Sequence, residues 1–159
     1  MIEGPVAVGP SGNQRMRKVL VIDDNATIVE LVRHAMLQRG GFEVIVAYNG
    51  VEGLEQFYRE RPDCVVVDVK MPELDGFKVV RAIRGDTSSA NTPLVILSAL
   101  HGEDETLTGL LSGVDAYVPK PFAPSLLVAT LDRVMAITPD ERSERIERLA
   151  SAGEPGDAS

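Results

Sequence analysis

The sequence has few of the residues that several functional classes require. Its single cysteine, Cys64, excludes a disulfide framework and a multi-cysteine zinc site. Tryptophan is absent and aromatic residues make up 4% of the chain, which argues against a base-stacking nucleic-acid surface. Lysine and arginine number 16 against 24 acidic residues, giving a net charge of −8. Such a chain repels phosphate backbones, so we expect no direct binding to nucleic acid.

Long apolar runs are also missing. No run reaches the ~18 residues of a membrane span. Glycines and prolines interrupt the first 14 residues, where a signal peptide would need an apolar core. These features predict a cytoplasmic protein with no membrane partner. The overall composition, 44% hydrophobic and 25% charged, is that of an ordinary globular domain.

Composition divides the 159 residues into three zones. Residues 1–15 are rich in glycine and proline, and we expect a disordered tail there. Residues 16–137 are dense in periodic apolar segments and are expected to form one domain. Residues 138–159 are charged, with Ile146 and Leu149 as one turn-spaced apolar pair. That pair predicts at most a short, fraying helix followed by disorder.

The middle zone alternates two patterns. Short, continuous apolar runs rich in β-branched residues are typical of strands buried on both faces of a parallel sheet. Between them lie stretches of helical length with apolar residues at helical spacing. The alternation predicts an α/β fold, a doubly wound (βα)₅ parallel sheet with helices on both faces. We expect strands at 19–22, 44–46, 65–67, 94–97 and 116–118, and helices around 28–36, 51–58, 77–83, 107–111 and 127–135.

Polar residues follow four of the five predicted strands, at the edge where open α/β sheets bind ligands. The first strand ends in Asp23 and Asp24, the third in Asp68, the fourth in Ser98, and the fifth runs into Lys120. Clustered carboxylates repel one another unless a cation is present, and Mg²⁺ suits such oxygen ligands. A lysine and a hydroxyl facing the acids look like a phosphoryl cradle, in which an aspartate can be the nucleophile.

A plainer interpretation is that Asp23 caps the following helix while Asp24 and Lys120 are solvated. Lys120 lies between two prolines, which restrict the backbone and place the ammonium reproducibly. The Lys120–Pro121 bond is also a candidate cis peptide.

Four segments resemble the receiver domain of two-component response regulators. They are VLVIDDN at 19–25, VDVKMPELDG at 67–76, PLVILSA at 93–99 and DAYVPKPF at 115–122, and together they extend over nearly all of the middle zone. The resemblance implies a flavodoxin-like sheet with strand order 2-1-3-4-5.

The resemblance also implies a role for each acid. Asp68 would accept a phosphoryl group from a histidine kinase or a phosphotransfer protein. Asp23 and Asp24 would hold Mg²⁺, with Asp68 and the backbone carbonyl of Lys70 completing the protein ligands. Such a domain is a regulatory phosphoacceptor rather than an enzyme, acting only on its own phosphoryl group.

Signalling would use the other site residues. Ser98 and Lys120 would bind the phosphoryl oxygens, and Tyr117 would be the switch aromatic that turns inward as Ser98 moves. The output would be a downstream protein target or an output domain. The face built by the fourth helix, fifth strand and fifth helix could also form a homodimer. That face is expected to carry Leu107, Leu111, Tyr117 and Val128.

Other classes remain open at this point. A haloacid-dehalogenase-like phosphatase would use Asp23 as its nucleophile, but Asn25 replaces the second acid of that motif. A flavodoxin-like FMN binder needs a Gly/Ser/Thr phosphate loop after the first strand, where two acids would repel the phosphate. An interaction module that is not phosphorylated would be expected to lack Asp68 or Lys120.

Overall fold

The computed structural model describes residues 16–98 and 113–152. Its centre is a five-stranded sheet in the order β2-β1-β3-β4-β5 with every neighbouring pair parallel. This confirms the predicted fold and strand order. The order sets β1 directly beside β3, so the first and third strands end side by side. The strands are β1 (Arg17–Ile22), β2 (Phe42–Ala47), β3 (Cys64–Asp68), β4 (Leu94–Ser98) and β5 (Ala116–Pro119).

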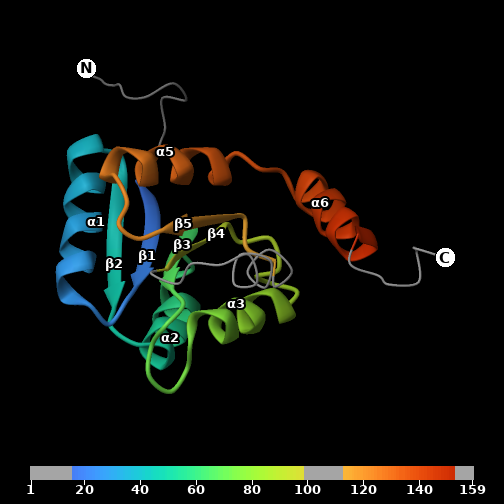
Figure 1. Ribbon diagram of the computed structural model, residues 1–159, viewed down its shortest axis with the longest axis horizontal. Helices are drawn as coiled ribbons and strands as arrows, with labels where there is room; N and C mark the ends of the chain where they lie inside the picture. Colours follow the sequence, from blue (N-terminus) through green and yellow to red (C-terminus); the bar gives the residue numbers. More distant parts are fainter. Residues whose placement is uncertain (1–15, 99–112, 153–159) are drawn as a thin grey trace.

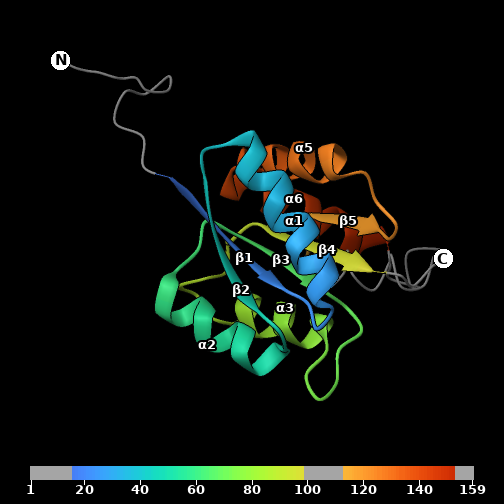
Figure 2. The same ribbon diagram turned by 90° about the vertical axis from the view of Figure 1, so that its left-hand side faces the viewer.

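Helices cover both faces of the sheet (Figures 1 and 2). Helices α1 (Ala26–Arg39) and α5 (Pro124–Met135) pack on one face, and α2 (Gly50–Glu60) and α3 (Gly76–Gly85) pack on the other. The helix expected around 107–111 and the tail expected at 1–15 lie outside the described residues. None of the described helices is both long enough and apolar enough to cross a membrane.

The strands are buried on both sides, which explains their continuous apolar runs. Val19 and Val21 of β1 belong to the core beneath α1 and α5, whereas Leu20 and Ile22 belong to the core beneath α2 and α3. Cys64 is fully buried as a small core residue, and burial raises the pKa of its thiol far above the usual value. The thiol therefore stays protonated and unreactive.

Helix α1 shows where apolar spacing predicts only part of a buried face. The spacing predicts a stripe that comprises Ile28, Leu31, Val32, Ala35 and Met36. Val32 and Met36 are fully buried as predicted, but Leu31 is 39% exposed and Val29, outside the stripe, is fully buried. The buried face runs through Val29, Val32 and Met36, which pack between the sheet and α5. Because apolar residues occur almost all round this helix, the sequence does not distinguish the two stripes.

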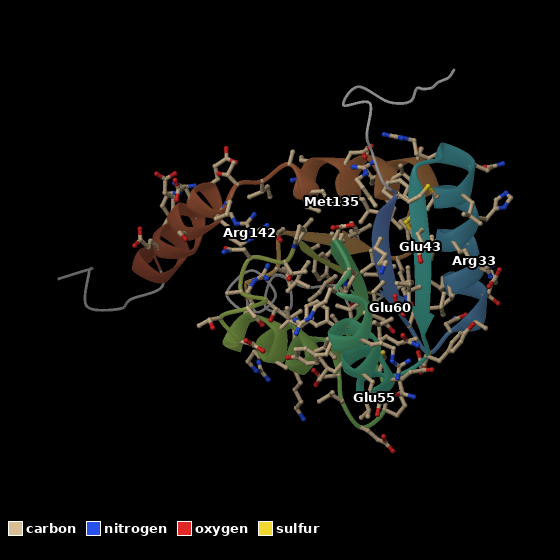
Figure 3. The ribbon with its side chains drawn as sticks, turned by 180° about the vertical axis from the view of Figure 1, so that it is seen from behind. Arg33, Glu43, Glu55, Glu60, Met135 and Arg142 are labelled. Carbon is tan, nitrogen blue, oxygen red and sulfur yellow. The ribbon has the colours of Figure 1, made fainter. Side chains whose placement is uncertain are left out.

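Beyond α5, the chain forms a further helix, α6 (Pro139–Ala152), at one end of the sheet (Figure 1). A short charged helix is predicted here, but its attachment differs from the expected loose end. Arg142 on α6 is only 2% exposed and points toward the body of the domain (Figure 3). The helix is thus anchored by a buried arginine, for which no apolar pattern gives a signal.

Candidate functional site

Three carboxylates meet at the carboxyl edge of the sheet. Asp23 and Asp24 follow β1, and Asp68 is the last residue of β3. Ile22 is paired with Val67, so the two strand ends are adjacent. One carboxylate oxygen from each of the three acids lies within 4.8 Å of the others. Asp23 and Asp68 are buried and Asp24 is exposed, so the cluster opens to solvent on the Asp24 side.

Lys120 lies against the acids rather than in solvent. Its Nζ is 2.9 Å from Asp23 Oδ2 and 3.5 Å from Asp68 Oδ1. Its backbone N–H donates to the Ser98 carbonyl at 2.7 Å, which ties the end of β5 to the end of β4. The Lys120–Pro121 peptide is cis, as predicted. The alternative of a solvated loop lysine is therefore wrong.

The capping alternative for Asp23 is also wrong. Asn25 caps α1, because its side chain accepts from the backbone N–H groups of Thr27 and Ile28. Asp23 points inward instead, where Oδ1 accepts from the Asn25 N–H at 2.9 Å and Oδ2 accepts from Lys120. Both oxygens of this buried carboxylate are thus held in fixed positions.

The pKa of Asp68 is raised from 3.8 to about 6. Burial is the main cause and repulsion from Asp23 adds to it, while Lys120 and a hydrogen bond from the Lys70 backbone oppose the rise. The carboxylate is therefore ionised near neutral pH but poorly compensated. Three carboxylates facing one ammonium leave an excess of negative charge, and an all-oxygen donor set of this kind fits Mg²⁺.

Gly76 positions Asp68, a contribution that motif reading alone does not reveal. Gly76 is the first residue of α3, and a Cβ added there would run into the backbone carbonyl of Asp68. Its N–H donates to the Val69 carbonyl at 2.9 Å. Asp75 caps the helix by accepting from the Lys78 N–H. The start of α3 is thereby pressed against the end of β3, and only glycine fits this approach.

The remaining predicted site residues have different surroundings. Ser98 ends β4 on the strand next to Asp68 and is fully buried. Tyr117 is half-buried and packs against the core beneath α2 and α3. The Lys70 side chain is exposed, and the Lys70 backbone makes a hydrogen bond to Asp68. The roles of the Lys70 carbonyl as a metal ligand and of Tyr117 as a switch stay predictions.

Val128 does not belong on an exposed signalling face, so that expectation is wrong. It is 7% exposed and packs in the core between α1 and α5. There it lines a groove of about 590 Å³ between these helices, which contains none of the clustered acids. Leu107 and Leu111, expected on the same face, lie outside the described residues.

The parallel sheet, its strand order and the acids at its carboxyl edge define the class of CheY-like receiver folds. A family model described as the response regulator receiver domain matches residues 19–132. The chain belongs to this family, as its four sequence segments predict.

The chain is also similar to individual named proteins. The chain is 38% identical over 130 residues to response regulator MprA of Mycobacterium leprae, an alignment covering 81% of this chain and 56% of that protein. It is 40% identical over 121 residues to the probable transcriptional regulator ycf27 of Guillardia theta, covering 76% and 46%. In a solved structure, that of chemotaxis response regulator CheY4 of Vibrio cholerae, the protein is 36% identical to this chain. The match covers 75% of this chain and 98% of that one, with a TM-score of 0.69. The chain spans about half the length of the curated relatives it matches.

The family establishes the general activity. The chain contains the receiver domain of a response regulator in two-component signalling, and such domains are regulatory rather than classical enzymes. Receiver domains bind Mg²⁺ at an acidic cluster, and Asp23, Asp24 and Asp68 form such a cluster here. The phosphatase alternative through Asp23 has no support from these matches.

Proposed function

We propose that Asp68 accepts a phosphoryl group from a histidine kinase or a phosphotransfer protein, and that residues 16–137 form the unit that does so. The observation that carries the proposal is the approach of the Lys120 ammonium to both Asp68, at 3.5 Å, and Asp23, at 2.9 Å. That ammonium faces the position an incoming phosphoryl group would take and neutralises part of its charge.

In the transfer step, an oxygen of ionised Asp68 forms a bond to phosphorus while the P–N bond of the donor phosphohistidine breaks. The electron pair returns to the imidazole nitrogen of the donor. A carboxylate with a pKa of about 6 is ionised at neutral pH, yet more basic than an ordinary aspartate, which favours attack on phosphorus. When bound, Mg²⁺ supplies charge neutralisation at the transferred oxygens.

Each neighbouring residue has a part in this proposal. Asp23, Asp24 and Asp68 would hold Mg²⁺ with the Lys70 carbonyl. Lys120 and Ser98 would hold phosphoryl oxygens, since both strand ends lie at the edge that carries Asp68.

Downstream, movement of Ser98 toward the phosphoryl group would bias the packing of Tyr117. The face that includes β5 and α5 would then engage a protein target, an output domain or a second copy. Structures with and without a phosphoryl analogue should differ in the rotamers of Ser98 and Tyr117. Identical rotamers would contradict the switch.

The test uses acetyl phosphate with Mg²⁺, followed by intact-protein mass spectrometry. We expect one added phosphoryl group that hydroxylamine removes. Asp68→Asn should abolish it, whereas Asp140→Asn, an exposed change of the same charge on α6, should leave it intact. Strong labelling of Asp68→Asn, or labelling unaffected by EDTA, would contradict the proposal. Continuous turnover of a phosphate ester that Asp23→Asn abolishes would favour the phosphatase instead.

A further inference from the structure

At the amino ends of the strands, away from the acid cluster, one buried carboxylate accepts hydrogen bonds from three arginines. Asp115 directly precedes β5, and its side chain is fully buried. Its Oδ1 accepts from Arg142 Nε at 2.8 Å and from Arg145 Nη2 at 2.6 Å. Its Oδ2 accepts from Arg142 Nη2 at 3.1 Å, from Arg84 Nη2 at 3.2 Å and from the Leu94 backbone N–H at 2.9 Å. Arg84 comes from α3, whereas Arg142 and Arg145 come from α6.

The same two arginines attach α6 to the backbone. Arg142 Nη1 donates to the Asn91 carbonyl at 2.9 Å, and Arg145 Nη2 donates to the Val114 carbonyl at 3.1 Å. Figure 3 shows Arg142 extending from α6 toward the body. Among the side chains that the structure describes, Arg142 and Arg145 make the polar contacts between α6 and the rest of the domain. The polar part of this attachment is therefore made by two guanidinium groups.

The positive charge of the arginines around Asp115 is not fully compensated. Three guanidinium groups face one carboxylate, and Arg145 Nε is buried with no hydrogen-bond partner. Burial also lowers the pKa of Arg84 to about 10. Guanidiniums crowded around one acceptor repel one another, and this repulsion opposes the docking of α6 that the hydrogen bonds to Asp115 favour.

Asp115 also joins the two strands, β4 and β5, whose other ends lie at the proposed phosphoryl site. The Asp115 N–H donates to the Leu94 carbonyl at 2.7 Å, and its side chain accepts from the Leu94 N–H. Asp115 therefore fixes the starts of β4 and β5 to each other. The other ends of these two strands carry Ser98 and Lys120.

We propose that α6 is an ionic strap on the β4–β5 pair. Docked on Asp115, it opposes the adjustment of the strand ends that a phosphoryl group at Asp68 requires. Occupation of the site then weakens docking of α6, and release of α6 strengthens binding at the site by the same factor, because coupling between two sites is reciprocal. This coupling rests on the proposed function, whereas the ionic docking does not.

Docking is measured by electron paramagnetic resonance between spin labels at Ser143→Cys on α6 and Arg81→Cys on α3, both exposed positions. Buried Cys64 does not compete for the label. We expect one narrow distance distribution that ~1 M salt changes little, because salt screens a buried ion pair much less than an exposed one. Arg142→Ala should broaden it, whereas Arg148→Ala, which removes the same charge from an exposed position on the same helix, should not. Equal distributions in the two variants would overturn the strap.

Coupling is measured by titrating beryllofluoride, an analogue of the phosphoryl group, in the presence of Mg²⁺. Arg142→Ala should bind the analogue at least ~3-fold more tightly than wild type, while Arg148→Ala should match wild type. Equal affinities in all three proteins would overturn the coupling.

Two further outcomes separate the possible failures. If wild type binds no analogue, the proposed function fails together with the coupling, while the distance measurement still reports on docking. If circular dichroism shows that Arg142→Ala is unfolded, Arg145→Ala, whose side chain is more exposed, replaces it in both measurements.

Discussion

Replacing Asp68 with asparagine should stabilise the ion-free protein. The raised pKa means that folding places the ionised carboxylate in unfavourable surroundings, through burial and the proximity of Asp23. A rise from 3.8 to about 6 corresponds to about 3 kcal/mol, at ~1.4 kcal/mol per pKa unit. Solvent screening at the open side of the site reduces this to about 1–2 kcal/mol. Asparagine keeps the shape and removes the charge, so the free energy of unfolding should rise by that amount.

The pH dependence of this destabilisation follows from the linkage between proton binding and folding. An acid whose pKa is higher in the folded than in the unfolded state binds protons more tightly when folded. Its destabilising effect is therefore fully present above pH 6 and disappears as the pH falls from about 6 to 4. The stability gap between Asp68→Asn and wild type should be largest at pH 8 and should close by about pH 4.

The assay is urea unfolding in EDTA, followed by far-ultraviolet circular dichroism because the chain has no tryptophan. Asp24→Asn is the matched control, since it removes the same charge from the exposed member of the cluster and should change stability less. An Asp68→Asn protein no more stable than wild type at pH 8, or a gap independent of pH, would refute the reasoning. Added Mg²⁺ should reverse the order by stabilising wild type more than the variant.

Three further outcomes are expected. Gly76→Ala should lower the free energy of unfolding by about 1–3 kcal/mol because the added Cβ would meet the Asp68 carbonyl. Gly85→Ala, whose Cβ would have nothing near it, should not lower it. Equal effects of the two substitutions in urea unfolding would contradict the close approach. Asp115→Ala should lower the free energy of unfolding by about 3–5 kcal/mol because it leaves buried guanidinium groups without their carboxylate partner. A decrease below about 1 kcal/mol would show that the cluster contributes little to stability. Lys70→Asn should speed loss of the phosphoryl group from Asp68, since the exposed Lys70 cation can pair with the phosphoryl oxygens. Unchanged decay in a single-turnover experiment would show that this side chain does not set the lifetime of the phosphoryl group.

The sheet and its ligand edge could be predicted because their signals are local. Strands buried on both faces give continuous apolar runs, and residues such as Asp68 and Lys120 follow those runs directly. The neighbouring positions of β1 and β3 required the family resemblance, because alternation of strands and helices does not determine strand order.

The features that the sequence did not reveal depend on tertiary contacts. The burial of Arg142 requires Asp115, 27 residues earlier in the chain, and a charged residue on a polar helix normally predicts solvent. The buried stripe of α1 depends on where α5 packs, and the burial of Val128 has the same origin. Gly76 stands in a motif, but the reason for it is visible only where α3 meets the Asp68 carbonyl.

The pairing of Lys120 with Asp23 has a consequence for how this domain depends on its solution. A dissolved cation can leave the acids, whereas a side chain fixed by the fold cannot, so the cluster keeps one positive charge whatever the ionic composition. The fold can therefore form without an added ion, although bound Mg²⁺ would stabilise it further. In a chain carrying Lys120→Ala, the free energy of unfolding should depend more strongly on divalent cations than it does in wild type.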